Sequence, residues 1–425
     1  MSLTPPLSGI VARRVLAIAL ARLREEPVVA QQGPRSVGKS TQLAQLAAAR
    51  GAEVLDLDDL GLRDAVRIDP ASFVTGPAPV FIDEYQHVPA VLDAIKAELN
   101  RDMRPGRFVV TGSTRHDALP KAAQSLTGRL HILPVLPLSQ GELAGARENL
   151  LEVVLDNPQA VPAGWTSNLE KADYIARIVA GGMPIPLARE PGAPRQRWFD
   201  DYVGLIMDRD VAELSRLRQR DQMPSLLQRL AAQTAQVLNV TKAAQGLGVD
   251  RTTAADYVKL LEAVFLVRRL EAWGTTLRAR SAGSPKIHIV DSGVAARLLR
   301  LSPERLGRRD PTSLTEFGHL LETFVVGELL KQASWLDDVA GCGHWRTRDG
   351  DEVDLVVERG DGGIVAFEVK AAARVPGEEM RHLRKLREAT GDAFLAGVAL
   401  YTGPRAYRFE DRLWVLPIES VWSAL

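Results

Sequence analysis

The stretch GPRSVGKS, residues 33–40, constrains the fold of this chain more than any other feature of the sequence. It has the spacing G-x-x-x-x-G-K-S, in which the glycines permit a loop that turns successive backbone N–H groups inward. A strand-like run, PVVAQQ, precedes the loop, and a helical run, STQLAQLAAAR, follows it. This order of strand, loop and helix N-terminus predicts a phosphate-binding loop at the edge of a parallel α/β sheet.

The side chains of this loop define the expected nucleotide site. Lys39 is expected to reach the β- and γ-phosphates of ATP, and Ser40 is expected to bind Mg²⁺ with Thr41 beside it. The backbone N–H groups of the loop and the dipole of the following helix should hold the phosphates. The predicted nucleotide-binding residues are Gly33, Pro34, Arg35, Ser36, Val37, Gly38, Lys39, Ser40 and Thr41.

Two acidic residues end a second strand-like run, PVFIDEYQ. A parallel strand would deliver Asp83 and Glu84 to the carboxyl edge of the sheet, where the phosphate loop also lies. We expect Asp83 to bind Mg²⁺ and Glu84 to orient the attacking water, because one carboxylate cannot easily do both. Solvated acids at a strand end are the alternative for this pair taken alone, but the loop upstream favours a nucleotide site.

Two further residues are candidates for contact with the γ-phosphate. Thr111 ends the buried run GRFVVTGST, where it could sense the phosphate, although Thr-Gly-Ser is also ordinary turn chemistry. Arg129 precedes another apolar run, and an arginine can stabilise a transferring phosphoryl group in its own subunit or in a neighbouring one. A structural salt bridge is the alternative role for Arg129.

Length and composition indicate a protein of several domains. The chain has 425 residues, 46% hydrophobic and 25% charged, with 53 basic and 53 acidic residues. This balance gives no overall positive charge, so any DNA-binding surface must be local. We predict an α/β protein with a P-loop ATPase domain containing a parallel sheet (residues 1–150), a helical and winged-helix domain (151–310) and a restriction-endonuclease-like α/β domain (311–425).

No segment indicates a membrane or secreted protein. The run VARRVLAIALARLREE is interrupted by Arg22 and Arg24 and lacks a small-residue cleavage site, so we expect an amphipathic helix there. No run approaches the roughly 20 apolar residues that span a bilayer. The single cysteine, Cys342, excludes an internal disulfide and fits a cytoplasmic location.

Several short motifs occur in a fixed order along the chain: GPRSVGKST, VFIDEYQHVP, VVTGS, SLTGR, PLSQGEL, GGMP and PKIHIVDSG. The ordered set resembles the AAA+-like P-loop ATP-binding proteins of bacteria and archaea that carry an uncharacterised C-terminal domain. The resemblance covers nearly the whole chain and implies little about the substrate. It implies ATP binding and hydrolysis at Gly33, Gly38, Lys39, Ser40, Asp83 and Glu84.

The run VLNVTKAAQGLGVDRTTAADYVKLLEAVFLVRRLEAW has the pattern of a winged helix-turn-helix. Thr241 and Asp250 are expected to cap two short helices joined by the GLGV turn, with apolar residues at helical spacing facing the core. The other face of the second helix would then offer polar side chains to a DNA groove. The predicted DNA-binding residues are Arg251, Thr252, Thr253 and Lys259.

Three basic residues further along, Arg278, Arg280 and Lys286, are expected to extend this surface toward the DNA backbone. Packing between domains or coupling of subunits is the alternative role of such a module.

Near its end the chain contains GDEVDLVVERGDGGIVAFEVKAA, which places Asp354 on one strand and Glu368 and Lys370 on the next. Alternation along the strand puts Glu368 and Lys370 on one face. Metal-dependent phosphodiester cleavage needs carboxylates around Mg²⁺ or Mn²⁺ and a nearby cation. The preceding helix offers Glu322 as a third carboxylate, with Glu328 as a substitute.

This constellation resembles the PD-(D/E)XK nucleases. The predicted nuclease site consists of Glu322, Asp354, Glu368 and Lys370, with Mg²⁺ or Mn²⁺ as its metal. The spacing is short enough to arise by chance in a charged protein, and a nuclease-like fold does not establish cleavage. A domain retained for DNA docking or assembly is the alternative.

Together the motifs predict an Mg²⁺-dependent ATPase that acts on DNA as a motor or switch in DNA processing or repair. ATP turnover would reposition the winged-helix and nuclease-like domains. Two alternatives stay open: an ATP-regulated metal-dependent nuclease, and a nucleotide-controlled signalling or protein-binding switch without DNA. Arg129 makes most catalytic sense across a subunit interface, which predicts a homo-oligomer.

Overall fold

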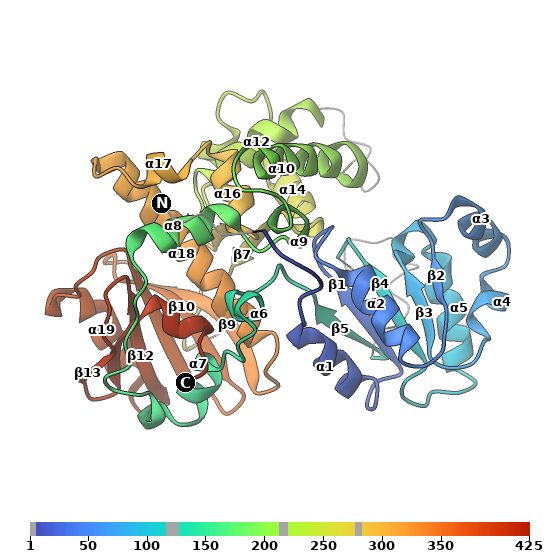
Figure 1. The fold of residues 1–425 in the computed structure, drawn as a ribbon, viewed down its shortest axis with the longest axis horizontal. Coiled ribbons are helices and arrows are strands. Elements are labelled where there is room, and N and C mark those ends of the chain that lie inside the picture. The colour runs from blue at the N-terminus through green and yellow to red at the C-terminus, as the bar shows by residue number, and fades with distance from the viewer. Residues whose placement is uncertain (1–5, 116–125, 127, 212–219, 277–282) are drawn as a thin grey trace.

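A computed structural model of the chain describes residues 6–115, 126, 128–211, 220–276 and 283–425. Three parts follow one another along the sequence (Figure 1). A sheet near the N-terminus lies on one side of the molecule, and a second sheet near the C-terminus lies on the other. Most of the helices that lie between them in sequence, among them α10 (Ala193–Leu205), α12 (Met223–Ala231) and α14 (Arg251–Ala263), occupy the top of the view, whereas α7 (Leu150–Asp156) lies beside the C-terminal sheet.

The N-terminal sheet has five strands, and every pairing in it is parallel. Its order is β2 (Val54–Asp56), β3 (Val80–Asp83), β4 (Phe108–Gly112), β1 (Val28–Gln32) and β5 (Leu130–Pro134). Successive residues of β1 point to opposite faces, so Val29 and Ala30 belong to different hydrophobic cores. Burial on both faces explains the continuous apolar runs from which the parallel sheet was predicted.

Helices cover both faces of this sheet. One core includes residues of α1 (Arg14–Arg22) and α2 (Lys39–Ala48), and the other includes residues of α3 (Leu60–Ile68), α4 (Pro70–Val74) and α5 (Ala90–Leu99). The helix α2 begins directly after the phosphate loop, and β3 ends at Asp83. The predicted nucleotide residues therefore lie at one edge of the sheet.

The middle part is helical. Its first helices are α6 (Gln140–Ala144), α7 (Leu150–Asp156), α8 (Lys171–Ala180), α9 (Pro184–Leu187) and α10 (Ala193–Leu205). The helix α10 continues into a π-helical turn, Ile206–Asp210. Such turns are rare and occur frequently at functional sites.

Three of the described helices and a small sheet follow in the segment where the sequence predicts a winged helix. The helices are α12 (Met223–Ala231), α13 (Val240–Ala244) and α14 (Arg251–Ala263), and the sheet has the order β6 (Gln236–Val237), β8 (Lys286–Ile289), β7 (Val267–Leu270).

The caps of α13 and α14 differ from the prediction at one position. The Asp250 side chain accepts from Thr253 N–H at 2.8 Å, as predicted. The predicted cap Thr241 is wrong, because α13 begins at Val240 and Asn239 caps it instead, accepting from Lys242 N–H at 2.9 Å.

The C-terminal part combines a long helix with a mixed six-stranded sheet. The short helices α16 (Ser292–Leu298) and α17 (Pro303–Leu306) lead into α18 (Pro311–Ala333). The sheet order is β13 (Tyr407–Glu410), β14 (Leu413–Pro417), β12 (Phe394–Tyr401), β11 (Ile364–Lys370), β10 (Glu352–Arg359), β9 (Val339–Arg346). Both α18 and α7 pack against this sheet, which is also covered by α19 (Arg381–Thr390).

Several of the motifs outside the nucleotide site meet where the three parts join. Gly182 of GGMP donates its N–H to Asp291 of VDSG at 2.7 Å, and its carbonyl accepts from Leu138 of PLSQGEL at 2.8 Å. Gln140 of the same motif donates its N–H to Glu328 of α18 at 2.7 Å. These motifs thus hold the parts of the chain together.

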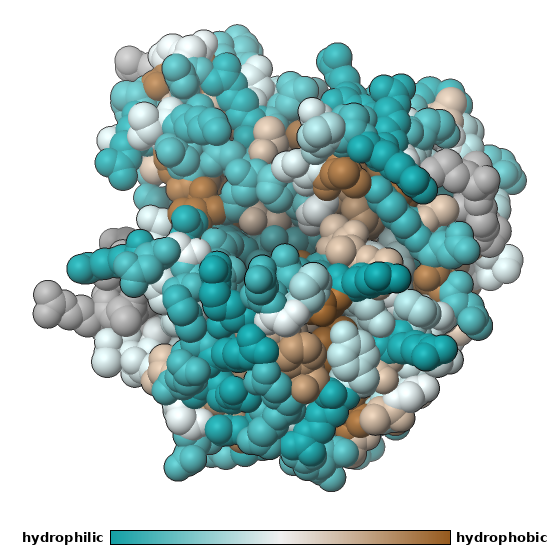
Figure 2. All heavy atoms as spheres, turned by 90° about the vertical axis from the view of Figure 1, so that its left-hand side faces the viewer, coloured by the Kyte–Doolittle hydropathy of each residue, from teal (hydrophilic) through white to brown (hydrophobic). Residues whose placement is uncertain are grey.

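The surface is mostly hydrophilic on the side formed by the C-terminal part, and its hydrophobic side chains form small separate patches (Figure 2). Among the described residues, no helix combines the length and apolar character needed to cross a membrane.

Candidate nucleotide site

The glycines of the phosphate loop are required by its backbone. A Cβ atom on Gly33 would lie 1.9 Å from the carbonyl oxygen of Val135, so no larger residue fits there. Gly38 has a φ of 95°, in the left-handed region that glycine adopts without strain. Ser36 also has a positive φ of 62°, which shows that the loop holds an unusual conformation along its length.

Arg13 fixes this loop from outside the motif. Its guanidinium donates to the carbonyl oxygens of Val37 and Leu136, both at 2.7 Å, and to Glu142 Oε1 at 3.0 Å. One planar side chain therefore joins the phosphate loop to the segment that follows β5. This role of Arg13 was not predicted, because no local pattern distinguishes it from the many other arginines of the chain.

Lys39 lies beneath the loop and is almost fully buried, with 3% of its surface exposed. Its ammonium donates to the carbonyl oxygens of Gly33 at 3.0 Å and Pro34 at 2.8 Å. Burial lowers the pKa of Lys39, and the nearby carboxylates of Glu84 and Asp83 oppose that effect. The lysine thus faces both the loop and the acids at the end of β3, as the motif predicts.

Asp83 is held at the end of β3 by hydroxyl groups. Thr111 donates a hydrogen bond to its Oδ1, and Ser40 donates another to its carboxylate. Burial raises the pKa of Asp83, and these two hydrogen bonds act in the opposite direction. Thr111 therefore lies in the site, although its contact is with Asp83.

Glu84 follows Asp83 in a left-handed conformation with φ of 53°, which is rare outside glycine. Its N–H lies 3.1 Å from Asp83 Oδ1 and 3.2 Å from Thr111 Oγ1. Its Oε2 accepts from the Ser113 hydroxyl at 3.1 Å and from the Gln86 amide. Two polar side chains, Ser113 and Gln86, thus fix the position of a buried carboxylate.

The predicted magnesium ligands suit that ion. The Ser40 hydroxyl and the Asp83 carboxylate are hard oxygen donors in direct contact. Magnesium in nucleotide sites is bound through one or two protein oxygens together with phosphates, so a cage of acids is not needed. Consistent with this, the part of the chain that the structure describes contains no cluster of three or more acidic, histidine or cysteine side chains suited to a metal.

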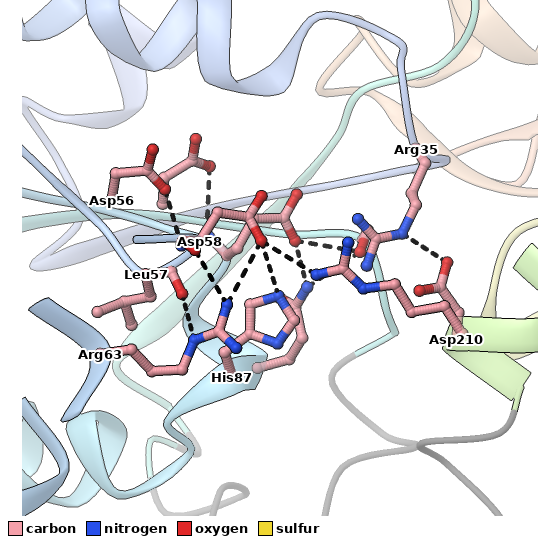
Figure 3. Close-up of polar contacts among 12 residues, drawn as sticks. Arg35, Asp56, Leu57, Asp58, Arg63, His87 and Asp210 are labelled. Atoms are coloured by element: carbon pink, nitrogen blue, oxygen red, sulfur yellow. Dashed lines mark hydrogen bonds and ion pairs between the residues drawn. The ribbon is translucent and has the colours of Figure 1, made fainter. Parts of the chain in front are cut away.

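Arg35 links the phosphate loop to the middle part of the chain (Figure 3). Its Nε donates to Asp210 Oδ2 at 2.6 Å, and Asp210 is only 3% exposed. The Tyr202 hydroxyl also donates to the Arg35 carbonyl at 3.4 Å. Asp210 ends the π-helical turn, so this unusual helical segment makes a partly buried ion pair with the nucleotide loop.

A second set of charges lies beside this pair, around Asp58 (Figure 3). Asp58 Oδ1 lies 3.6 Å from Arg63, 3.2 Å from His87 Nε2 and 3.2 Å from Arg209 of the π-helical turn. Arg209 and Asp210 therefore approach the N-terminal part at two neighbouring points. No local sequence pattern marks either residue.

Arg129 does not lie at this site. It directly precedes β5, and residues before a parallel strand lie at the amino edge of the sheet, opposite the phosphate loop. Its side chain donates to Asn100 Oδ1 at 2.6 Å. The structure thus contradicts the expected role of Arg129 within its own subunit, and a role in a neighbouring subunit stays a prediction.

The residues predicted to bind DNA divide into two groups. Arg251, Thr252 and Lys259 are exposed on α14, whereas Thr253 binds Asp250 through its N–H and hydroxyl. Arg278 and Arg280 lie outside the described residues. The prediction for Lys286 is wrong, because its side chain is fully buried and contacts Asp354 of the C-terminal part.

Two of the predicted nuclease residues, Glu322 and Asp354, meet around Lys286, and the other two, Glu368 and Lys370, pair with each other. The Lys286 ammonium lies 2.7 Å from Glu322 Oε1 and 2.9 Å from Asp354 Oδ1. Glu368 Oε1 accepts from the neighbouring Lys370 ammonium at 2.9 Å. Burial alone would lower the pKa of Lys286, but the surrounding carboxylates raise it well above its usual value.

Glu328, the substitute for Glu322, lies elsewhere. It pairs with Lys331 and accepts from Gln140 N–H, at the junction described above.

Three family models match consecutive parts of the chain. Residues 25–144 match a model described as an AAA domain. This part is an AAA-type P-loop domain. Residues 171–305 and 317–421 match two models described as domains of unknown function, DUF8612 and DUF4143.

The chain is also similar along most of its length to proteins of mycobacteria. The uncharacterized protein Rv2008c of Mycobacterium tuberculosis is 28% identical over 416 residues, which are 97% of this chain and 85% of that protein. The uncharacterized protein Mb2031c of Mycobacterium bovis matches to the same extent. Among solved structures, a Walker-type ATPase of Pyrococcus abyssi matches 70% of this chain and 98% of its own, with 15% identity and a TM-score of 0.44.

The partly buried pair between the AAA domain and the π-helical turn makes a prediction about stability. We expect the double variant Arg35→Met/Asp210→Asn to lose less free energy of unfolding than the two single variants lose when their losses are added. The double-mutant cycle should give a coupling free energy of about 1–3 kcal/mol, because a partly buried charged hydrogen bond is lost only once. Urea unfolding followed by circular dichroism measures each term.

The exposed pair Asp256 and Lys259, at 2.9 Å, is the matched control. Its coupling should stay below about 0.5 kcal/mol. Equal coupling in the two cycles would show that Arg35 and Asp210 do not form a partly buried pair in solution.

Proposed function

We propose that this protein hydrolyses ATP with Mg²⁺ in its AAA domain and uses nucleotide binding to change the position of its middle part. One observation carries the proposal. Two pairs of residues that are far apart in the sequence converge at one edge of a parallel sheet: Lys39 with Ser40, and Asp83 with Glu84. They lie next to a loop in which a larger residue would clash at Gly33 and be strained at Gly38. These groups are those that phosphoryl transfer needs.

Each residue has a role that follows from its contacts. The Lys39 ammonium now binds two neutral carbonyls, and charged phosphate oxygens would be stronger partners for it. Ser40 and Asp83 would hold Mg²⁺, which when bound neutralises charge on the phosphates.

Glu84 is the candidate for orienting the attacking water. Both hydrogen-bond donors, Ser113 and Gln86, bind its Oε2, so Oε1 is the oxygen that can accept from a water molecule. Glu84 is the catalytic residue in this account, and Ser113 and Gln86 are positioning residues. Their hydrogen bonds fix the direction in which the carboxylate points.

The π-helical turn supports a switch function. Arg35 stands within the phosphate loop, so a nucleotide that attracts its guanidinium competes directly with Asp210. Arg209 on the same turn binds Asp58 of the AAA domain at 3.2 Å. Because α10 runs into this turn without a break, a change at the loop would act on the helices of the middle part.

DNA is the partner that we propose for the middle part. Its predicted helix-turn-helix unit is followed by a sheet of order β6-β8-β7, the arrangement expected of a winged helix. The N-terminal end of α14 exposes Arg251 and Thr252, while its other end contacts the AAA domain, where Arg115 N–H donates to Ala263 at 2.9 Å. This helix could therefore connect a DNA surface with the nucleotide site.

We expect Lys39→Ala to lower the rate of ATP hydrolysis by at least about 100-fold, because the phosphates lose their buried cation. Glu84→Gln should lose turnover to a similar extent and still bind a fluorescent ATP analogue. A phosphate-release assay and an analogue titration separate the two effects.

Lys96→Ala, which removes an exposed lysine of α5, is the matched control and should keep full activity. Hydrolysis that survives Lys39→Ala would refute the proposed function.

The DNA proposal predicts salt-dependent binding to duplex, single-stranded or branched DNA, and a change of ATPase rate when DNA binds. Arg251→Ala should weaken binding and reduce the slope of log K against log salt by about one, since one phosphate contact is lost. Arg50→Ala, an exposed arginine of the AAA domain, should change neither. Negligible binding that does not respond to salt would favour a nucleotide switch without DNA.

A further inference from the structure

The buried lysine Lys286 is the centre of the charge cluster in the C-terminal part. Its ammonium lies 2.7 Å from Glu322, 2.5 Å from Glu352 and 2.9 Å from Asp354. A lysine ammonium has three N–H donors, and here three carboxylates surround it. Its side chain is 0% exposed, so these carboxylates replace the water that it loses.

Lys286 reaches this position because the hairpin that carries it is attached to the C-terminal sheet. Trp273 N–H donates to the His344 carbonyl at 2.6 Å, and His344 N–H donates to the Glu271 carbonyl at 3.0 Å. The Trp273 indole also donates to Glu358 Oε2 at 2.9 Å. The backbone of the middle part thus continues the edge of the sheet at β9, which brings the neighbouring strand β8 against α18 and β10.

Further contacts engage most of the other polar atoms of the predicted nuclease site, although Glu368 Oε2 is buried without a hydrogen-bond partner among the described residues. Asp354 Oδ2 accepts from Val369 N–H at 2.9 Å. Lys370 lies 2.9 Å from Glu368 and 2.6 Å from Glu379. Asp354 and Glu368 are 7% and 6% exposed, so a DNA phosphate has little access to either carboxylate.

The donor set of this cluster does not fit the metal that the nuclease resemblance implies. A divalent cation bound by Glu322 and Asp354 would need the carboxylate oxygens that bind Lys286, and it would lie within contact distance of a buried ammonium. Two cations cannot share this position without strong repulsion. The described residues accordingly contain no cluster suited to a metal ion.

We propose that Lys286 is the resident cation of this carboxylate cluster, and that the cluster locks the middle part onto the C-terminal part in place of acting as a metal-dependent nuclease centre. In this proposal the C-terminal part serves as a docking surface for the middle part, and Lys286 neutralises its carboxylates in place of a metal ion. This inference concerns a site separate from the AAA domain and does not depend on ATP hydrolysis.

Metal binding by the full-length protein is the first test. Mn²⁺ binding without nucleotide, followed by electron paramagnetic resonance, should be the same for the wild type and Asp354→Asn. Neither protein should nick DNA in Mn²⁺. Mn²⁺ binding or nicking by the wild type that is lost in Asp354→Asn would overturn the proposal.

Stability is the second test. Lys286→Met keeps most of the side-chain volume but leaves three carboxylates without their cation, and it should lower the midpoint of thermal unfolding by about 10 °C. Lys259→Met, which removes an exposed lysine, should change it little. An unchanged midpoint in Lys286→Met would contradict the lock.

A third variant covers the case in which Lys286→Met does not fold. Lys286→Met combined with Glu322→Gln and Asp354→Asn removes two of the three uncompensated charges together with the lysine, and the third, Glu352, keeps its contact with Arg346 at 3.5 Å. The triple variant should recover a large part of the lost stability, because the penalty comes from unpaired buried charge. A triple variant no more stable than Lys286→Met would show that the lysine acts through packing and would overturn the proposal.

Discussion

The partly buried ion pair between Arg35 and Asp210 is the interaction on which our account of this protein depends. It joins the phosphate loop to a π-helical turn at 2.6 Å, and Asp210 is almost completely shielded from water. A charge in such a place is stable only with its partner, so the loop and the turn constrain each other. Any ligand that attracts Arg35 must therefore change the environment of Asp210.

Buried ion pairs also occur where the other parts of the chain meet. Lys286 of the middle part is surrounded by carboxylates of the C-terminal part, and Glu328 of α18 binds both Lys331 and the backbone of Gln140. Paired buried charges specify which surfaces meet, because any other arrangement would leave a buried charge without its oppositely charged partner. These polar contacts accompany a hydrophobic core that runs continuously through all three parts of the chain, and together they give the chain one defined arrangement.

The sequence predicted the elements of the nucleotide site because each has a local pattern. The loop, its flanking strand and helix, and the acids at the end of β3 can all be recognised within a few residues. The pair Arg35 and Asp210 is separated by 175 residues, and the contact from Lys286 to Asp354 by 68, so no local pattern marks them. Arg129 is different, since its position before β5 already implies the amino edge of the sheet.

The most direct test follows hydrogen exchange in Ile206–Asp210 when a non-hydrolysable ATP analogue binds with Mg²⁺. Our account predicts that exchange in this turn changes in the wild type and does not change in Lys39→Ala at the same analogue concentration. Strand β12, far from the loop in the sequence and in a different sheet, serves as the internal reference. Unchanged exchange in the turn of a wild-type protein saturated with the analogue would contradict the coupling between the AAA domain and the middle part.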